Sequence, residues 1–355
     1  MLASVPEGAS RNVTRFHTIS TWHPSTSLIY KHLIPFENHI SHIFSPKLDI
    51  KSMPSLQDAR SSNAAFQPSY VPVMVVTGGT AGIGQAMAQA LARHLKGRVH
   101  IVIVGRNEKA AEATLASLPN TSQESTYEFV KCELTVMKNI HAMAAELKTR
   151  LTKVNFLVHC AAVVGFGGRE ETEEGIDVKL ASRYYSRWKL TYELMPLLRK
   201  AKELGEDVGV MTVLGAGLGP EIDLNDLGLK TTYKAMKAME QTTAYNDLMV
   251  AEFAAREPDI AFTHTYPGPV FTGTISNQRL ITRLLVIPLR PILWLVTTPK
   301  EDCAEYMLYP LLSAKSGMHR RDKRGDDIGM TKFPTAEGAA KVLWDHSMKE
   351  TGSSD

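Results

Sequence analysis

The feature that most constrains the fold is the glycine-rich stretch TGGTAGIG at residues 77–84, which separates two segments of different hydrophobic period. Residues 71–76 form a short apolar run rich in valine, the pattern of a buried strand. Residues 85–95 carry Met87 and Leu91 on one helical stripe. A strand, a glycine turn and a helix in this order predict a phosphate-binding turn, with the bound anion at the helix N-terminus.

Strand-like and helix-like segments continue to alternate along the chain. The predicted strands are residues 71–76, 99–104, 127–131, 154–160, 208–214 and 260–265, and the predicted helices are residues 85–95, 109–118, 140–151, 175–202 and 237–256. Strands that are apolar on both faces need helices on both sides of the sheet. We therefore predict an α/β fold, a Rossmann-type doubly wound parallel sheet in a single domain with a small C-terminal substrate lid.

The predicted sheet domain spans residues 70–349, with the less regular residues 275–333 as the substrate lid and residues 350–355 as a tail. Residues 1–69 are predicted to be a poorly ordered N-terminal extension. Residues 1–52 are rich in Ser, Thr and His and poor in acids. Three interpretations of them stay open: a loosely ordered extension, a start codon assigned too early with Met53 as the natural start, or a mitochondrial presequence.

Composition and cysteine use narrow the partners and the compartment. The net charge is only +3 over 355 residues, so we predict no nucleic-acid partner. Cys132, Cys160 and Cys303 are far apart and lack CxxC spacing. This pattern predicts no metal site, no disulfide framework and a reducing, cytoplasmic compartment.

One apolar segment, residues 281–296, raises the question of a membrane. It contains Arg283, Pro288, Arg290 and Pro291, whereas a spanning helix needs about 20 apolar residues without central charges. We interpret the segment as a lid over an apolar small-molecule substrate. Attachment of this segment to a membrane surface is the weaker alternative.

Each glycine of the turn has a distinct task in a dinucleotide site. Gly78 permits the tight turn, Gly82 lets the backbone approach a pyrophosphate, and Gly84 lets the helix pack closely on the sheet. Thr80 and Ile83 lie in the same turn and are further cofactor-binding candidates. The helix N-terminus supplies N–H groups and a positive dipole end for the phosphates.

The end of the second predicted strand favours NADP over NAD. An NAD-selective site usually places an acid here, which accepts a hydrogen bond from the ribose 2′-hydroxyl. This chain has Gly105 instead, followed by Arg106 and Asn107. The guanidinium of Arg106 can hold a 2′-phosphate through charge-assisted hydrogen bonds. The alternative is an ordinary surface arginine at the start of a helix.

The motif TGxxxGxG at residues 77–84 resembles that of the short-chain dehydrogenase/reductase family, and the similarity extends over about residues 70–272. CEL at 132–134 stands where the family commonly has Asp-Leu near the adenine, and CAA at 160–162 stands where it has Asn-Ala-Gly. PGPVFT at 267–272 is similar to the family segment beside the nicotinamide. The resemblance adds as cofactor-binding candidates Glu133, Cys160, Ala161, Pro267, Val270 and Thr272.

Three shorter segments are similar to a fungal branch of the family often associated with secondary metabolism: YYSR at 184–187, VLGAG at 213–217 and VLWDH at 342–346. The resemblance implies an oxidoreductase that transfers hydride between NADP(H) and a small molecule. Homo-oligomers are usual in the family, although the residues of this chain give no independent sign of one.

Catalysis in the family uses a Tyr and a Lys one helical turn apart, where the Lys charge lowers the pKa of the Tyr. Tyr233 and Lys237 have this spacing and are our catalytic candidates. An alternative helix register places the two positions on Met239 and Thr243, and neither side chain can do this acid–base work. His159 is a further acid or base candidate, with a core histidine as the alternative.

The other two catalytic positions also differ from the family residues. The Ser position falls near Leu214, with Thr212 as the nearest hydroxyl, and the Asn position falls on Arg183. Arg183 can bind an acidic or carbonyl substrate, or pair with Glu133 or Asp177.

Two functions follow from these patterns. The first is an NADP-dependent oxidoreductase acting on a carbonyl or alcohol of an apolar small molecule. The second is an NADP(H)-binding protein without hydride chemistry, which the altered catalytic positions favour. We prefer the first, because the predicted fold, the glycine turn and the 267–272 segment agree.

Overall fold

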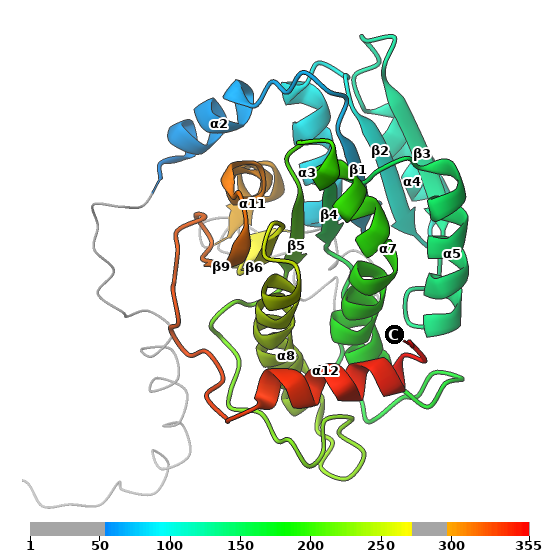
Figure 1. The fold of residues 1–355 in the computed structure, drawn as a ribbon, viewed down its shortest axis with the longest axis vertical. Coiled ribbons are helices and arrows are strands. Elements are labelled where there is room, and N and C mark those ends of the chain that lie inside the picture. The colour runs from blue at the N-terminus through cyan, green and yellow to red at the C-terminus, as the bar shows by residue number, and fades with distance from the viewer. Residues whose placement is uncertain (1–53, 272–296, 355) are drawn as a thin grey trace, which may run out of the picture. The chain divides into compact units, whose positions relative to one another are not determined.

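A sheet of seven parallel strands forms the centre of the structure, a computed structural model that describes residues 54–271 and 297–354. The strand order is β3-β2-β1-β4-β5-β6-β9 (Figure 1). The strands are β1 (Val73–Thr77), β2 (His100–Gly105), β3 (Thr126–Lys131), β4 (Phe156–His159), β5 (Gly209–Val213), β6 (Ala261–Thr265) and β9 (Gly317–Arg321). The predicted doubly wound parallel sheet is confirmed.

Helices cover both faces of this sheet (Figure 1). One face carries α3 (Gly82–His94), α4 (Glu108–Ala116) and α11 (Lys300–Ser313), and the other carries α5 (Met137–Arg150), α7 (Ser186–Glu203) and α8 (Ala235–Arg256). A last helix, α12 (Ala339–Glu350), crosses α7 and α8. Its Trp344 ring lies 5.0 Å from that of Trp188 and 4.9 Å from that of Phe253, centroid to centroid.

Two apolar cores follow from the alternation of side chains along the strands. In β1, Val73 and Val75 pack into the core beside α5, α7 and α8. The intervening Met74 and Val76 pack into the core beside α3 and α11. Because both faces of β1 are buried, the strand is apolar throughout, which is why its sequence lacks polar alternation.

The strand order changes direction at β1, which pairs with β2 on one side and with β4 on the other. Thr77, the last residue of β1, lies opposite Val104 and His159. The carboxyl ends of these three strands therefore meet, and ligands of open α/β sheets bind at such a switch point. Next to the main sheet, β7 (Val270–Phe271) pairs in parallel with β8 (Thr298–Pro299).

Part of the predicted N-terminal extension is instead an ordered helix, α2 (Leu56–Ala65), which begins with a capping box. Asn63 Nδ2 donates to Glu305 Oε2 at 2.8 Å, and Arg60 forms an ion pair of 2.7 Å with Asp302. These contacts attach α2 to α11. The prediction of poor order is therefore wrong for this segment, because partners 242 residues away in the sequence hold it.

The predicted lid, residues 275–333, is also corrected in part. Residues 272–296 lie outside the described residues. By contrast, α11 packs Cys303, Met307 and Leu308 into the core, and β9 pairs with β6. These two elements thus belong to the sheet domain. The sequence of β9, GMHRR, has one large apolar residue, so its hydrophobic pattern gave no strand signal.

The predicted helix over 175–202 consists of three consecutive segments: α6 (Val178–Leu180), the π-helical η1 (Ala181–Tyr185) and α7. It begins at Asp177, whose carboxylate accepts from the backbone N–H of Lys179 at 3.0 Å and of Leu180 at 3.1 Å. π-Helical turns inside α-helices occur frequently at functional sites.

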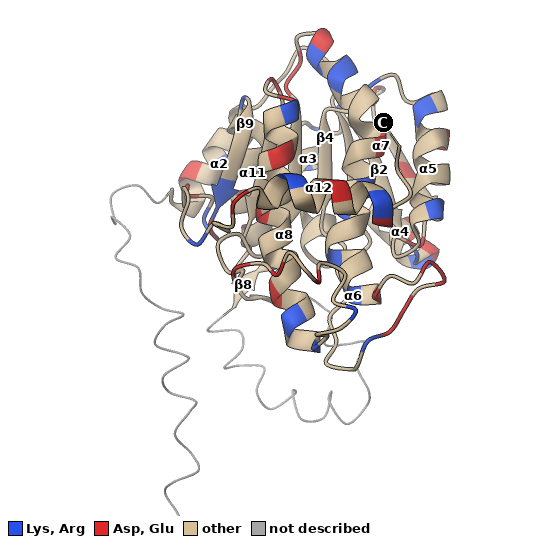
Figure 2. Cartoon of the chain, turned by 60° about the horizontal axis from the view of Figure 1, so that its bottom comes forward, with Lys and Arg blue, Asp and Glu red and all other residues tan. Residues whose placement is uncertain are grey.

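Charged residues of both signs are interspersed over α5, α7, α8 and α12 in the view of Figure 2. In this view neither sign of charge forms a separate patch on these four helices. Across residues 54–271 and 297–354, no helix is long and apolar enough to cross a membrane.

Candidate active site at the carboxyl edge of the sheet

The glycine turn fits closely between α3 and the end of β4. Gly78 has a φ of +73°, and a Cβ there would lie 2.7 Å from the backbone nitrogen of Ala161. A Cβ on Gly84 would lie 2.7 Å from the carbonyl oxygen of Gly78. Neither position has space for a Cβ, so both accept only glycine.

The N-terminus of α3 is open to an anion. Its N-cap residue, Ala81, has no side-chain acceptor and makes no capping hydrogen bond. The first N–H groups of the helix therefore keep their capacity to bind a phosphate. Thr80 and Ile83 flank this start, and the Thr80 methyl group would lie 3.2 Å from a Cβ on Gly105 at the end of β2. The residues present thus fit a dinucleotide.

At the end of β2, Arg106 contacts another predicted cofactor residue, Glu133. Arg106 Nη1 donates to Glu133 Oε2 at 3.0 Å, and the Arg106 side chain is 67% exposed. Burial raises the pKa of Glu133, but hydrogen bonds from Thr135 and Arg106 outweigh it and leave that pKa below the usual range. Asn107 has a structural task, since its side chain caps α4 by accepting from Ala110 N at 3.0 Å.

Cys160 and Ala161 continue from β4 directly beside the glycine turn. Cys160 N donates to Thr77 O at 3.0 Å, which extends the β1–β4 pairing by one residue. Burial raises the pKa of the Cys160 thiol to about 12, so it stays protonated and is no nucleophile at neutral pH. Both residues line the turn through backbone and Cβ atoms.

The predicted nicotinamide segment follows β6. Pro267 O accepts from Cys303 Sγ at 3.8 Å, and Val270 pairs with Thr298 between β7 and β8. The segment is therefore held against α11. Thr272, the last predicted cofactor residue, lies outside the described residues.

Tyr233 and Lys237 do not have the predicted arrangement on one helix. α8 begins at Ala235, so Tyr233 precedes its N-cap and lies in the approaching loop. Lys237 Nζ donates to Thr232 Oγ1 at 2.6 Å and lies 3.7 Å from Asp223 Oδ2. The prediction of a Tyr–Lys pair one turn apart is wrong here, because the helix starts two residues too late.

Tyr233 instead has two other cations beside its ring. Lys179 Nζ lies 5.6 Å from the ring centroid, and the Arg169 guanidinium carbon lies 6.0 Å from it. The Tyr233 hydroxyl oxygen is buried and has no hydrogen-bond partner among the described residues. Arg169 is in turn fixed to the loop before α8, since its Nη1 donates to Gly228 O at 2.9 Å.

The alternative family positions lie on the inner turns of α8 and at the end of β5. The Thr243 hydroxyl donates to Met239 O at 3.1 Å, and a Cβ on Gly215 would lie 3.0 Å from the Thr243 methyl group. Thr212 is fully buried and donates to Asn246 Oδ1 at 2.7 Å. Thr212 therefore connects β5 to α8 and is not presented to a substrate.

His159 is a core histidine. It is 1% exposed, and its Nε2 lies 3.0 Å from Thr191 Oγ1. Burial, with a smaller effect of the Arg187 charge, lowers the pKa of His159 to about 3. The ring is thus neutral at physiological pH and buried away from any substrate, as the alternative interpretation expects.

Arg187 is a further residue at this edge of the sheet that was not among the predicted site residues. This residue is 1% exposed, and its Nη2 donates to Ala161 O at 2.9 Å while its Nη1 donates to Val213 O at 3.1 Å. It thus bridges the carboxyl ends of β4 and β5. The spacing of Lys179, Arg183 and Arg187, four residues apart each time, was the available signal.

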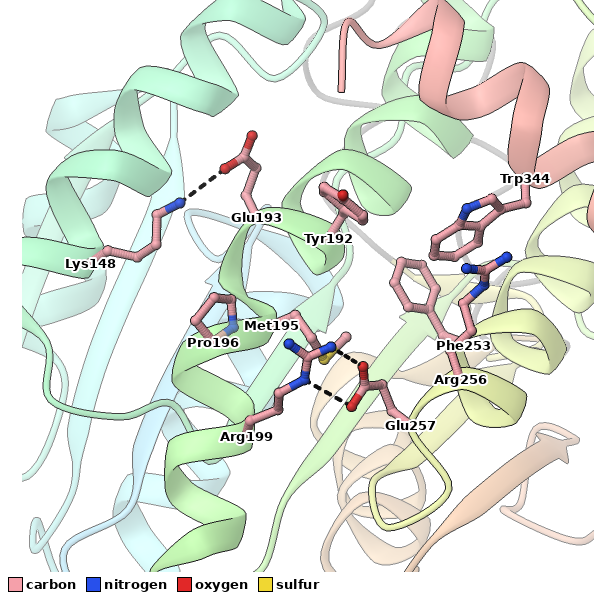
Figure 3. A pocket seen from close by; sticks show the side chains of 10 residues that line it. All are labelled: Lys148, Tyr192, Glu193, Met195, Pro196, Arg199, Phe253, Arg256, Glu257 and Trp344. Carbon is pink, nitrogen blue, oxygen red and sulfur yellow. Dashed lines mark hydrogen bonds and ion pairs between the residues drawn. The ribbon is translucent and has the colours of Figure 1, made fainter. Parts of the chain in front are cut away.

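A separate pocket of about 630 Å³ lies between α5, α7, α8 and α12 (Figure 3). Lys148 pairs with Glu193 and Arg199 with Glu257 inside the pocket, while Arg256 pairs with Glu252 on its own helix. The end of α7 and Glu257 lead into the amino ends of β5 and β6. The pocket therefore belongs to the edge of the sheet opposite the glycine turn.

Comparisons with known proteins agree with this architecture. Residues 72–222 match the family model described as short chain dehydrogenase. The oxidoreductase andH of Emericella variicolor is 30% identical over 265 residues, which cover 74% of this chain and 76% of that protein. Human polyprenol dehydrogenase is 28% identical over 300 residues, which cover 82% of this chain and 88% of that protein.

A solved short-chain dehydrogenase/reductase from Serratia marcescens has the same fold, with a TM-score of 0.52 at 16% identity over 72% of this chain and 98% of that one. The glycine turn, the parallel sheet and the two relatives lead to one conclusion. This chain belongs to the short-chain dehydrogenase/reductase family of oxidoreductases.

Proposed function

We propose that the protein is an NADP(H)-dependent oxidoreductase acting on a carbonyl or alcohol of an apolar small molecule, in secondary metabolism. The observation that carries the proposal is the backbone cradle: Gly78 and Gly84 leave no space for a Cβ, and α3 starts without a side-chain cap. The name of the human relative, polyprenol dehydrogenase, supports an apolar alcohol or carbonyl as substrate.

The preference for NADP rests on Arg106. Its exposed guanidinium follows β2, which ends at Gly105 and offers no carboxylate to a ribose hydroxyl. The ion pair with Glu133 is largely exposed and therefore weak, so a 2′-phosphate competes for the guanidinium at little cost.

NADPH supplies the hydride when it is bound in the cradle. In this proposal Tyr233 gives its hydroxyl proton to the carbonyl oxygen as the carbonyl carbon is reduced. The tyrosinate left behind is stabilised by the Lys179 and Arg169 cations beside its ring. In alcohol oxidation the same tyrosinate takes the proton back.

The test is NADPH binding and NADPH consumption over a panel of apolar ketones and aldehydes, with wild type and Tyr233→Phe. We expect Tyr233→Phe to bind NADPH normally and to lose turnover by about 100-fold or more. Lys237→Met is the matched control and should change turnover less than Lys179→Met. Turnover that survives Tyr233→Phe would move the acid to another residue.

The second candidate is a cofactor-binding protein without hydride chemistry. The specific observation in its favour is that Lys237 is engaged by Thr232 and Asp223 rather than by Tyr233. Tight NADPH binding with no consumption over the whole panel would favour it, and steady consumption with any ketone would exclude it.

A further inference from the structure

The continuous helical segment formed by α6, η1 and α7 carries three regularly spaced cations near its start. Lys179 lies in α6, Arg183 in η1 and Arg187 in α7, four residues apart each time. Lys179 is 4% exposed and Arg187 is 1% exposed, while Arg183 is partly buried. None of the three forms an ion pair with a carboxylate of the described residues.

The two acids predicted to pair with Arg183, Asp177 and Glu133, are bound to other groups. Asp177 accepts hydrogen bonds from backbone N–H groups at the start of α6, and Glu133 pairs with Arg106. Neither of the two pairings predicted for Arg183 is present. Of the residues that the structure does not describe, 272–296 contain no Asp or Glu.

Arg320 provides a comparison, because it is a buried arginine that does have a counterion. Arg320 is as deeply buried as Arg187, but its Nη2 lies 2.7 Å from Asp247 Oδ2 and its Nε lies 2.9 Å from Asp247 Oδ1. Arg187 has only neutral acceptors, and its Nε has no partner among the described residues. A buried charge without a counterion is costly, so its retention calls for an anion that binds there.

Arg183 is the member of the row that can bind it. Its Nε donates to Thr242 Oγ1 at 3.2 Å and its Nη2 reaches Met239 O at 3.5 Å, whereas its Nη1 bonds to none of the described residues. Burial lowers the pKa of Arg183 to about 10, so it remains a cation at neutral pH. Lys179 lies beside Tyr233, and Arg187 reaches the ends of β4 and β5, so the row borders the predicted reaction site.

We propose that Arg183, with Lys179 four residues before it in the same helical segment, binds a carboxylate of the substrate, so that the preferred substrate is an apolar molecule with one acidic group. The planar guanidinium matches the two oxygens of a carboxylate. Arg187 acts as a positioning residue, which holds the ends of β4 and β5 and adds positive potential below the site. The inference rests on the proposed function only in assigning the anion to a substrate.

The test compares two probes of equal shape, 4-(trifluoromethyl)benzoate and 4-(trifluoromethyl)benzamide. Each is titrated by fluorine NMR against the full chain, with and without saturating NADPH. We expect the acid to bind about tenfold more tightly than the amide. Arg183→Met should abolish this preference, Arg183→Lys should keep part of it, and Lys237→Met should leave it unchanged.

A thermal unfolding measurement separates a binding role from a structural one. We expect Arg183→Met to melt at or above the wild-type temperature, because it removes an unpaired charge. Equal affinities for acid and amide in wild type, or a preference that survives Arg183→Met, would overturn the proposal. A preference that disappears when NADPH is bound would also overturn it, since the cations would then serve the cofactor phosphates.

These titrations involve no turnover. Acid binding without NADPH consumption would therefore refute the proposed function and keep the inference. NADPH consumption without a preference for the acid would support the proposed function and refute the inference.

Discussion

Two helical segments bring positive charge to the same carboxyl edge of the sheet, and they do so in different ways. α3 uses its uncapped backbone N–H groups, which the glycines of the preceding turn bring close to β4. The α6–η1–α7 segment uses side chains instead: Lys179 and Arg187, which are buried, and Arg183, which is partly buried. A backbone site imposes local glycine requirements, whereas a side-chain site depends on partners that are distant in sequence.

The largest expected change in stability comes from Arg320, the buried arginine that pairs with Asp247. Arg320→Met leaves Asp247 buried without its guanidinium partner, so we expect a loss of about 3–5 kcal/mol in the free energy of unfolding. Urea denaturation measures this loss. If Arg320→Met were no less stable than Arg183→Met, paired and unpaired arginines would not differ in this protein.

The backbone site can be damaged with a single methyl group. In Gly84→Ala the new Cβ meets the Gly78 carbonyl, and we expect a stability loss of about 1–3 kcal/mol and NADPH binding weakened about tenfold or more. Gly167→Ala is the matched control, since a Cβ there has no neighbour within 4 Å. Unchanged NADPH affinity in Gly84→Ala would show that the cofactor does not use this turn.

A smaller effect on the free energy of unfolding is expected from the titration of His159, the last residue of β4. Its folded pKa of about 3 lies below the ordinary value of 6.5, so the unfolded chain binds the proton more readily. Its contribution to stability is therefore present above pH 6.5 and is lost as the pH falls from 6.5 toward 3.

Between pH 7 and pH 5.5 the loss from His159 should be about 1 kcal/mol. Denaturation of wild type and His159→Gln at both pH values measures it as a difference in pH dependence. Parallel stability curves for the two proteins would mean that the imidazole has the same pKa in the folded and unfolded states.

The sheet and the glycine turn could be predicted because both are local. Continuous valine-rich runs and a glycine turn before a helical stripe fix β1, α3 and β2 without knowledge of distant residues. α2 and β9 could not be predicted, since their sequences are polar and their partners lie far along the chain.

The catalytic side was predicted less well for the same reason. Spacing alone paired Tyr233 with Lys237, but the start of α8 after Lys234 separates them. The neighbours of Tyr233 are Lys179 and Arg169, which come from the segment after β4 and are more than fifty residues away in the sequence. Only the packed structure brings these three together.

The most direct measurement is the affinity of the protein for NADPH and for NADH, determined by fluorescence titration of wild type and Arg106→Glu. We predict that wild type binds NADPH at least about tenfold more tightly than NADH, and that Arg106→Glu removes or reverses this preference. Binding of neither dinucleotide, or a preference for NADH in wild type, would contradict it.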